Sequence, residues 1–489
     1  MDDRISLLLN KIGRGDMLNT AYDTAWVARL TEINREAGLL ALNWLCRHQL
    51  PDGSWGAKQS YCYHDRVIST LSAMIALTYY GKRESDRVLI EKGLRALEKI
   101  TDRATKGLNA TPYGATVGFE MIVPTLVDEA ESLGIIKQQK ERILGRLKQQ
   151  RSQKLARLTG KMINRYVTVA FSAEMAGTDG QRMLDIENLQ EENGSIGCSP
   201  SATAYYAICV NKGDKKALDY LYTTFGKDGG VPNVAPFDTF EISWTLWNFS
   251  MLSNFKDIKE TQRHVDALSR SWDKQNGGGF ASEYSVIDSD MSSMVFDTLL
   301  RYGVQKNMDV ILNYEEKDWF RCYDLESDPS ISANVHVLGA LREVGYRKDN
   351  PSIGKIIRFL QQTKSSWGYW GDKWHISPYY TTAHAVMVCA GFADEVVSDA
   401  VNWLLNTQRS DGSWGLFGPT AEETAYALQA LWLWDQKSQH IPKECLHKGK
   451  IWLENHQDYE YNPLWIGKCL YSPRLVIDSA VATALELVN

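Results

Sequence analysis

A short turn sequence recurs along this chain and restricts the folds that it can adopt. Residues 49–56 (QLPDGSWG) reappear almost unchanged as residues 408–415 (QRSDGSWG), and weaker copies occupy residues 190–196, 274–280 and 361–367. Glycine supplies a left-handed turn, and we expect glutamine to cap a neighbouring helix and tryptophan to pack beneath it. One such turn per pair of helices is typical of a helical repeat array. We assign these turns a structural role, because they offer no acid, base or activated nucleophile.

Apolar residues follow helical spacing along most of the chain, as at Ile68, Leu71 and Ile75, whereas strand-like alternation is scarce. We therefore predict an all-α protein whose helical hairpins close into barrels of paired helices. With 489 residues, of which 44% are hydrophobic, the chain is long enough for two domains with ample cores.

Charge, cysteine content and the distribution of apolar residues limit the partners and the location that we expect. A formal net charge of −6 argues against a nucleic-acid partner. Eight cysteines without a CxxC pair indicate reduced thiols and a cytoplasmic location, not a disulfide frame or a zinc ribbon. No basic segment leads into an apolar stretch at the N-terminus, and no run approaches about 18 apolar residues, so we expect neither a signal peptide nor a membrane span.

Residues 286–294 (VIDSDMSSM) place two carboxylates, Asp288 and Asp290, at the start of a helix predicted to run to Gly303. The apolar residues that follow would bury this end of the helix, which allows one acid to face a dry cavity and to act as a Brønsted acid. For Asp288, a helix N-cap is an equally good interpretation, because Asp is among the commonest residues at that position.

Blocks along the whole chain resemble the class II diterpene cyclases, such as copalyl diphosphate synthases, including their shorter bacterial members. The repeated turn is similar to the QW motif of terpene cyclases, and the other blocks are residues 21–28 (AYDTAWVA), 64–66 (HDR), 117–120 (VGFE), 199–204 (SPSATA), 229–234 (GGVPNV), 237–241 (FDTFE), 372–380 (DKWHISPYY) and 420–425 (TAEETA). The resemblance implies two α/α barrels with the active cavity between them. The β domain would comprise residues 1–22 and 212–489, and an inserted γ domain would comprise residues 23–211.

The resemblance also implies a reaction. Such an enzyme protonates the terminal alkene of geranylgeranyl diphosphate, lets the cation close two rings, and loses a proton while the diphosphate stays attached. The family's Asp-x-Asp-Asp acid motif falls on residues 288–291, which makes Asp290 the candidate general acid and Asp288 its orienting neighbour. Met291 departs from the motif. An alkene is a weak base, so the acid must be neutral. Burial would have to raise the pKa of the acid, because the helix N-terminus favours the charged carboxylate.

The end of the reaction is expected to differ from that of the plant enzymes, in which a His and an Asn hold the water that takes the last proton. Asn233 matches the Asn, but Phe171 stands at the His position. A phenyl ring cannot accept a proton, although its face stabilises a cation by ~0.5 to 2 kcal/mol. We therefore predict hydride and methyl shifts that lead to a halimadienyl- or kolavenyl-type diphosphate instead of copalyl diphosphate.

By the same resemblance, Lys154 is a candidate diphosphate ligand, Mg²⁺ is the expected cofactor, and Glu120 is a candidate metal ligand. The alternatives are a solvated helix face for Lys154 and a structural ion pair for Glu120. We find no Asp-Asp-x-x-Asp set in the sequence, so we expect no second, ionising activity. A separate class I terpene synthase or a phosphatase would then consume the product.

Two further groups of residues are candidates for the cavity. Asn334 and His336 are candidate hydrogen-bond partners of the acid. Aromatic residues are candidates for the wall, with ordinary core packing as the alternative for each: Trp244, Trp367, Trp370, Trp374, Tyr379 and Tyr380.

Three other functions compete with this interpretation. Farnesyl diphosphate could replace the longer substrate and give a drimane. A zinc-dependent protein prenyltransferase β subunit shares the α/α barrel, but no cysteine here stands in a recognisable zinc-ligand pattern. A barrel protein that binds prenyl groups without catalysis would explain Met291 and Phe171.

Overall fold

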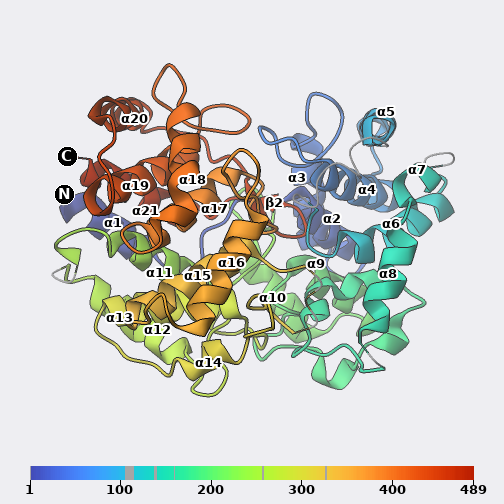
Figure 1. Ribbon diagram of the computed structural model, residues 1–489. Coiled ribbons are helices and arrows are strands. Elements are labelled where there is room, and N and C mark those ends of the chain that lie inside the picture. Colours follow the sequence, from blue (N-terminus) through green and yellow to red (C-terminus); the bar gives the residue numbers. More distant parts are fainter. Residues whose placement is uncertain are drawn as a thin grey trace.

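A computed structural model describes residues 2–104, 115–136, 140–158, 160–255, 258–324, 326 and 328–488. Helices account for nearly all of its regular structure, so the predicted all-α class is confirmed (Figure 1). The described part of the chain holds a single pair of short strands, β1 (Trp465–Ile466) and β2 (Leu470–Tyr471), which form an antiparallel hairpin. No helix among the described residues has the length and apolarity that a bilayer crossing requires.

Six helices form a closed ring in the C-terminal part of the chain, each packed against the next and the last against the first. The inner ring consists of α11 (Asp238–Phe249), α13 (Ser289–Arg301), α15 (Ile331–Glu343), α17 (Pro378–Cys389), α19 (Ala421–Lys437) and α21 (Arg474–Leu487). The outer layer consists of α12 (Thr261–Ser271), α14 (Asp309–Leu312), α16 (Pro351–Thr363), α18 (Asp394–Asn406), α20 (Lys443–Asn455) and the N-terminal helix α1 (Asp2–Lys11). We call this unit the first barrel.

A second ring lies beside the first and is drawn from blue to green in Figure 1. Its inner elements are α2 (Ala21–Ala28), α4 (Tyr63–Tyr80), α6 (Phe119–Ser132), the 3₁₀ segment η2 (Thr168–Ala176) and α9 (Pro200–Tyr205). Its outer elements are α3 (Arg35–Arg47), α5 (Glu84–Ala104), α7 (Lys140–Leu144), α8 (Leu147–Ala156) and α10 (Lys215–Thr224). Short segments extend or link these helices: η1 (Arg29–Glu32), η3 (Gln181–Met183), η4 (Ile186–Asn188) and the π-helical η5 (Tyr206–Val210).

The recurring turns join neighbouring outer helices. Gln49 Nε2 donates to the backbone oxygen of Gly53 and to that of Leu89 in α5, both at 2.8 Å, and Gln408 bonds in the same way to its own turn and to Cys445 in α20. Gly53 adopts φ +91, a left-handed conformation that glycine tolerates best. These contacts are structural, as the sequence predicts for the turns.

Two hydrophobic cores correspond to the two barrels. One combines residues 5–9 with residues from 242 onward, and the other runs from Ala21 to Val231 and includes Cys469 of the hairpin. The predicted start of the β domain at residue 212 differs from this division, because Ala217, Tyr220 and Leu221 of α10 pack into the second core.

The β1–β2 hairpin carries residues of the first barrel into the second. The backbone oxygen of Gly467 accepts from the amide of Val117 at 2.7 Å, and the amide of Leu470 donates to Asp65 Oδ1 at 3.0 Å. The tip of the hairpin therefore closes the space between the barrels from one side.

Candidate active site

A cavity of about 290 Å³ lies at the junction of the two barrels, and most of its wall is apolar. The second barrel contributes residues from α6, α8 and η2, and the first contributes residues from α11, from the loop before α13 and from α17. The hairpin supplies Trp465, Ile466 and Gly467. Five of the polar residues predicted for the site line this cavity: Asp288, Asp290, Asn233, Lys154 and Glu120.

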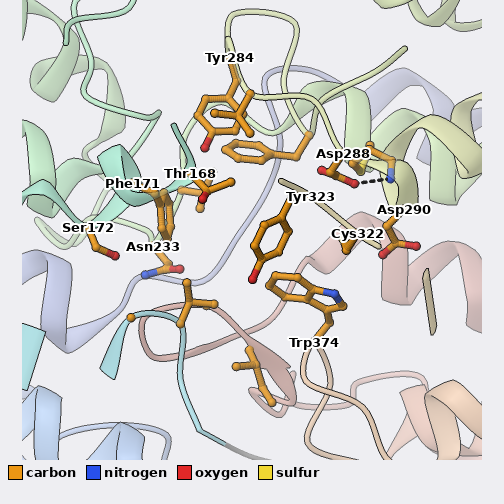
Figure 2. A pocket seen from close by; sticks show the side chains of 18 of the residues that line it. Thr168, Phe171, Ser172, Asn233, Tyr284, Asp288, Asp290, Cys322, Tyr323 and Trp374 are labelled. Atoms are coloured by element: carbon orange, nitrogen blue, oxygen red, sulfur yellow. Dashed lines mark hydrogen bonds between the residues drawn. The ribbon is translucent and has the colours of Figure 1, made fainter. Parts of the chain in front are cut away.

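Asp288 is both the N-cap of α13 and part of the cavity wall. Its Oδ1 accepts from the amide of Met291 at 2.7 Å, which is the dashed line in Figure 2. Burial, followed by the nearby charge of Asp290, raises the pKa of Asp288 to about 8. The capping interpretation is thus correct, and it does not exclude a part in catalysis, because a carboxyl with such a pKa keeps its proton at neutral pH.

Asp290 has a histidine partner. Its Oδ1 lies 2.5 Å from His336 Nδ1, and His336 Nε2 lies 2.9 Å from His384 Nδ1. Burial, and then the charges of His336 and His375, hold the pKa of His384 well below its ordinary value, so that His384 stays neutral. The other face of His336 meets the Trp244 ring edge-on at 5.6 Å between centroids. An imidazole N–H aimed at Asp290 stabilises the carboxylate that remains after proton transfer.

Asn334 does not contact the acid, contrary to the prediction. Its side chain accepts from the amide of Phe320 at 2.8 Å and donates to the backbone oxygens of Phe320 and Ser330. In α15, Asn334 and His336 stand two residues apart and hence on different faces of the helix. Only His336 faces Asp290.

Asn233 and Phe171 lie on the side of the cavity opposite to Asp288 and Asp290 in Figure 2. Asn233 Nδ2 donates to Asp23 Oδ2 at 2.8 Å, while its Oδ1 has no hydrogen-bond partner among the described residues and turns toward the cavity. Phe171 and Ser172 reach the wall from η2. No imidazole lines the cavity within the described part of the chain.

Lys154 and Glu120 form an ion pair at the wall of the cavity, and Arg157 stands beside them. The Lys154 side chain is 44% exposed and that of Glu120 is 13% exposed, so neither is locked in the core. A single carboxylate with nearby cations suits Mg²⁺ held mainly through phosphate oxygens. Among the described residues no three His, Cys, Asp or Glu side chains gather as a ready-made metal site.

The aromatic predictions divide into two groups. Trp244, Trp374 and Tyr380 line the cavity. Trp367 does not, because it is 75% exposed on a surface turn. Trp370 and Tyr379 are also wrong as wall residues, since both are buried in the first barrel's core and neither reaches the cavity.

Several wall residues escape prediction from the sequence: Tyr284, Cys322, Tyr323, Trp465 and Tyr471. The last two sit on the hairpin, which no helical pattern or motif signals. Cys322 accepts the amide of Ser289 on its backbone oxygen at 2.7 Å and so lies directly behind the acidic turn. Burial and the charge of Asp288 raise the pKa of its thiol well above the usual value, so this cysteine stays neutral. None of the eight cysteines, all of which lie in the described residues, forms a disulfide.

Comparison with known proteins extends over the whole chain. Residues 322–460 match the family model of the squalene-hopene cyclase C-terminal domain. A type B diterpene cyclase of Mycobacterium tuberculosis is 45% identical over 491 residues, covering 99% of this chain and 98% of the relative. An ent-copalyl diphosphate synthase of a Streptomyces species is 28% identical, covering 91% and 87%. The solved structure of ent-copalyl diphosphate synthase from Streptomyces platensis superposes with a TM-score of 0.80 at 26% identity, covering 99% and 98%.

Proposed function

Because this chain belongs to the class II diterpene cyclases, we propose that it converts geranylgeranyl diphosphate into a rearranged bicyclic diterpenyl diphosphate. The reaction is an isomerisation: one proton enters at the terminal alkene, two rings close, and one proton leaves. The carbon–oxygen bond to the diphosphate stays intact. The observation that carries this proposal is an acid pair, Asp288 and Asp290, in a mostly apolar cavity with a histidine behind it.

The pair solves the problem of protonating a very weak base. Since two neighbouring carboxyls in a dry site do not both ionise, a proton remains on the pair near neutral pH, as the raised pKa of Asp288 indicates. Asp290 gives its proton to the alkene, whose π electrons form the new C–H bond. The carboxylate left on Asp290 is then held by His336 Nδ1–H.

The aromatic wall protects the cation once it has formed. Trp244, Trp374 and Tyr380 present ring surface at the acid end of the cavity, and each ring stabilises a nearby cation by ~0.5 to 2 kcal/mol. The same rings exclude water that would quench the cation before the second ring closes.

Phe171 supports a rearranged product. Each ring closure moves the positive charge away from the acid and toward the Phe171–Asn233 side of the cavity. Because phenylalanine accepts no proton there, the cation has time for 1,2-hydride and methyl shifts. A halimadienyl- or kolavenyl-type diphosphate is the expected result.

Lys154, Arg157 and Glu120 are our candidates for the diphosphate site, since they bring cations and one carboxylate to the wall of the second barrel. Glu120 is the residue that would hold Mg²⁺, and the metal would supply positive charge that neutralises the phosphate. The product keeps its diphosphate, so the enzyme that uses it must either ionise or hydrolyse that group.

Incubation with geranylgeranyl diphosphate, and separately with farnesyl diphosphate, tests the proposal after dephosphorylation and mass spectrometry. We expect a rearranged bicyclic C20 alcohol from wild type and more unrearranged copalol from Phe171→His. A drimane from farnesyl diphosphate alone would reassign the substrate. Identical copalol from wild type and Phe171→His would refute the rearrangement, and absence of any cyclic alcohol would refute the activity.

A further inference from the structure

Lys468 lies at the tip of the β1–β2 hairpin and is completely buried inside the second barrel. Its Nζ donates to Glu174 Oε1 at 2.6 Å, to Ser199 Oγ at 2.7 Å and to Ser201 Oγ at 2.8 Å. Three acceptors match the three N–H donors of an ammonium group, whereas a neutral amine has only two. Lys468 therefore holds a positive charge next to the cavity. The reaction proposed above gives this residue no role.

One aromatic ring separates the charge of Lys468 from the cavity. Its Nζ lies 4.6 Å from the centroid of Phe171. Phe171 lines the cavity but Lys468 does not, so the ring stands between the ammonium and the substrate space. A ring whose negative face is already occupied by one cation offers much less to a second cation on the opposite face.

The charge of Lys468 has one ionic partner and a second acidic group nearby. Glu174 is its ionic partner and also accepts from the hydroxyl of Tyr22 at 2.8 Å. Asp23 faces Asn233 and Thr20, and burial raises its pKa, which favours the neutral form. At the other side of the cavity stands Asp290, which becomes a carboxylate once it has given up its proton.

We propose that Lys468 is a specificity-determining residue, which disfavours positive charge beside Phe171 and drives the cyclised cation back toward Asp290 before it loses its proton. This inference rests on the proposed function and names the electrostatic interaction that would direct the rearrangement. In each shift a hydride or methyl group moves with its electron pair to the cationic carbon, so the charge steps one carbon nearer the acid. Finally a C–H bond breaks, its electron pair forms the alkene, and the Asp290 carboxylate takes the proton that restores the starting acid.

A series of variants that changes charge behind Phe171 tests this inference, with the ratio of unrearranged to rearranged alcohol as the readout. Lys468→Gln/Glu174→Gln removes both charges and retains hydrogen-bonding groups, and we expect the ratio to rise roughly tenfold. Glu174→Gln keeps the ammonium and removes its counter-charge, so the ratio should fall below that of wild type. Lys468→Arg keeps the positive charge, so its ratio should equal that of wild type.

The sign of the change separates electrostatics from structural damage. If Glu174→Gln raises the ratio as the double variant does, disturbed packing explains both, and Lys468 has no directing role. This single variant also stands as the test if the double variant does not fold, because glutamine still accepts from Tyr22. A wild type that makes only copalol refutes the proposed rearrangement itself, whereas a rearranging wild type with an unchanged ratio across the series refutes only the part played by Lys468.

Discussion

The rate of cyclisation should fall steeply above pH 8, because the acid pair then loses the proton that it must deliver. With a pKa of about 8 at Asp288, the protonated fraction is roughly 90% at pH 7, 10% at pH 9 and 1% at pH 10. Single-turnover formation of the bicyclic alcohol from geranylgeranyl diphosphate, measured between pH 6 and pH 10, should follow that fraction. The expected loss is about tenfold for each pH step above 8.

The matched variant is Asp288→Asn, which keeps an N-cap side chain for the amide of Met291 but removes the neighbouring acid. The variant removes the carboxyl whose pKa is raised to about 8, so the alkaline fall should begin at lower pH than in wild type. Circular dichroism at each pH controls for unfolding. A rate that stays flat to pH 10 in wild type, or the same alkaline fall in wild type and variant, would refute the shared-proton mechanism.

Three further changes test other parts of the site. Asp290→Asn should lower the single-turnover rate by at least about 10³-fold with the fold intact, and substantial residual activity would point to Asp288 as the donor. His384→Gln should lower the rate roughly tenfold and move the pH profile, without changing KM, because His384 orients the imidazole that holds Asp290; an unchanged pH profile would leave it a packing residue. Lys154→Met should raise KM about tenfold and leave the product ratio as in wild type, and an altered ratio would place it elsewhere than at the diphosphate.

Stability gives an independent measure of the same buried acid. Folding raises the pKa of Asp288 above its unfolded value, so the folded state binds this proton more tightly, and its stability declines as pH rises from about 4 to about 8. Asp288→Asn should therefore raise Tm by a few degrees at pH 8 and by much less at pH 4.5. An equal change in Tm at both pH values would contradict the burial effect.

Helical periodicity and the repeated turns were enough to predict the fold, because both are local properties of the sequence. The family resemblance likewise predicted that Asp288, Asp290 and Asn233 share one cavity, and of the two candidate partners of the acid only His336 contacts it. The wrong predictions for Trp367 and Trp370 have a common cause. Trp367 and Trp370 flank one turn, yet one is exposed and the other is buried, and only the path of the backbone around Gly368 decides between them.

Long-range contacts made by irregular segments were not predictable. Lys468 occurs in the sequence as an isolated basic residue between two short apolar pairs, which ordinarily indicates an exposed turn. Its burial depends on Glu174, Ser199 and Ser201, which lie more than 260 residues away. No period or spacing connects these positions, so the charge behind Phe171 becomes visible only in the assembled barrels.

Opposing contributions to the pKa of Asp288 explain why the start of α13 can hold a protonated acid. A helix N-terminus stabilises a carboxylate by up to ~2 kcal/mol, and the bond from the Met291 amide adds to it. The rise in the pKa of Asp288 from 3.8 to about 8 corresponds to about 6 kcal/mol in the opposite direction. Burial, and after it the charge of the second carboxyl, thus outweigh the cap. The proton donor is therefore a property of the pair, which is why replacing either aspartate should change the alkaline limit of the reaction and not its rate alone.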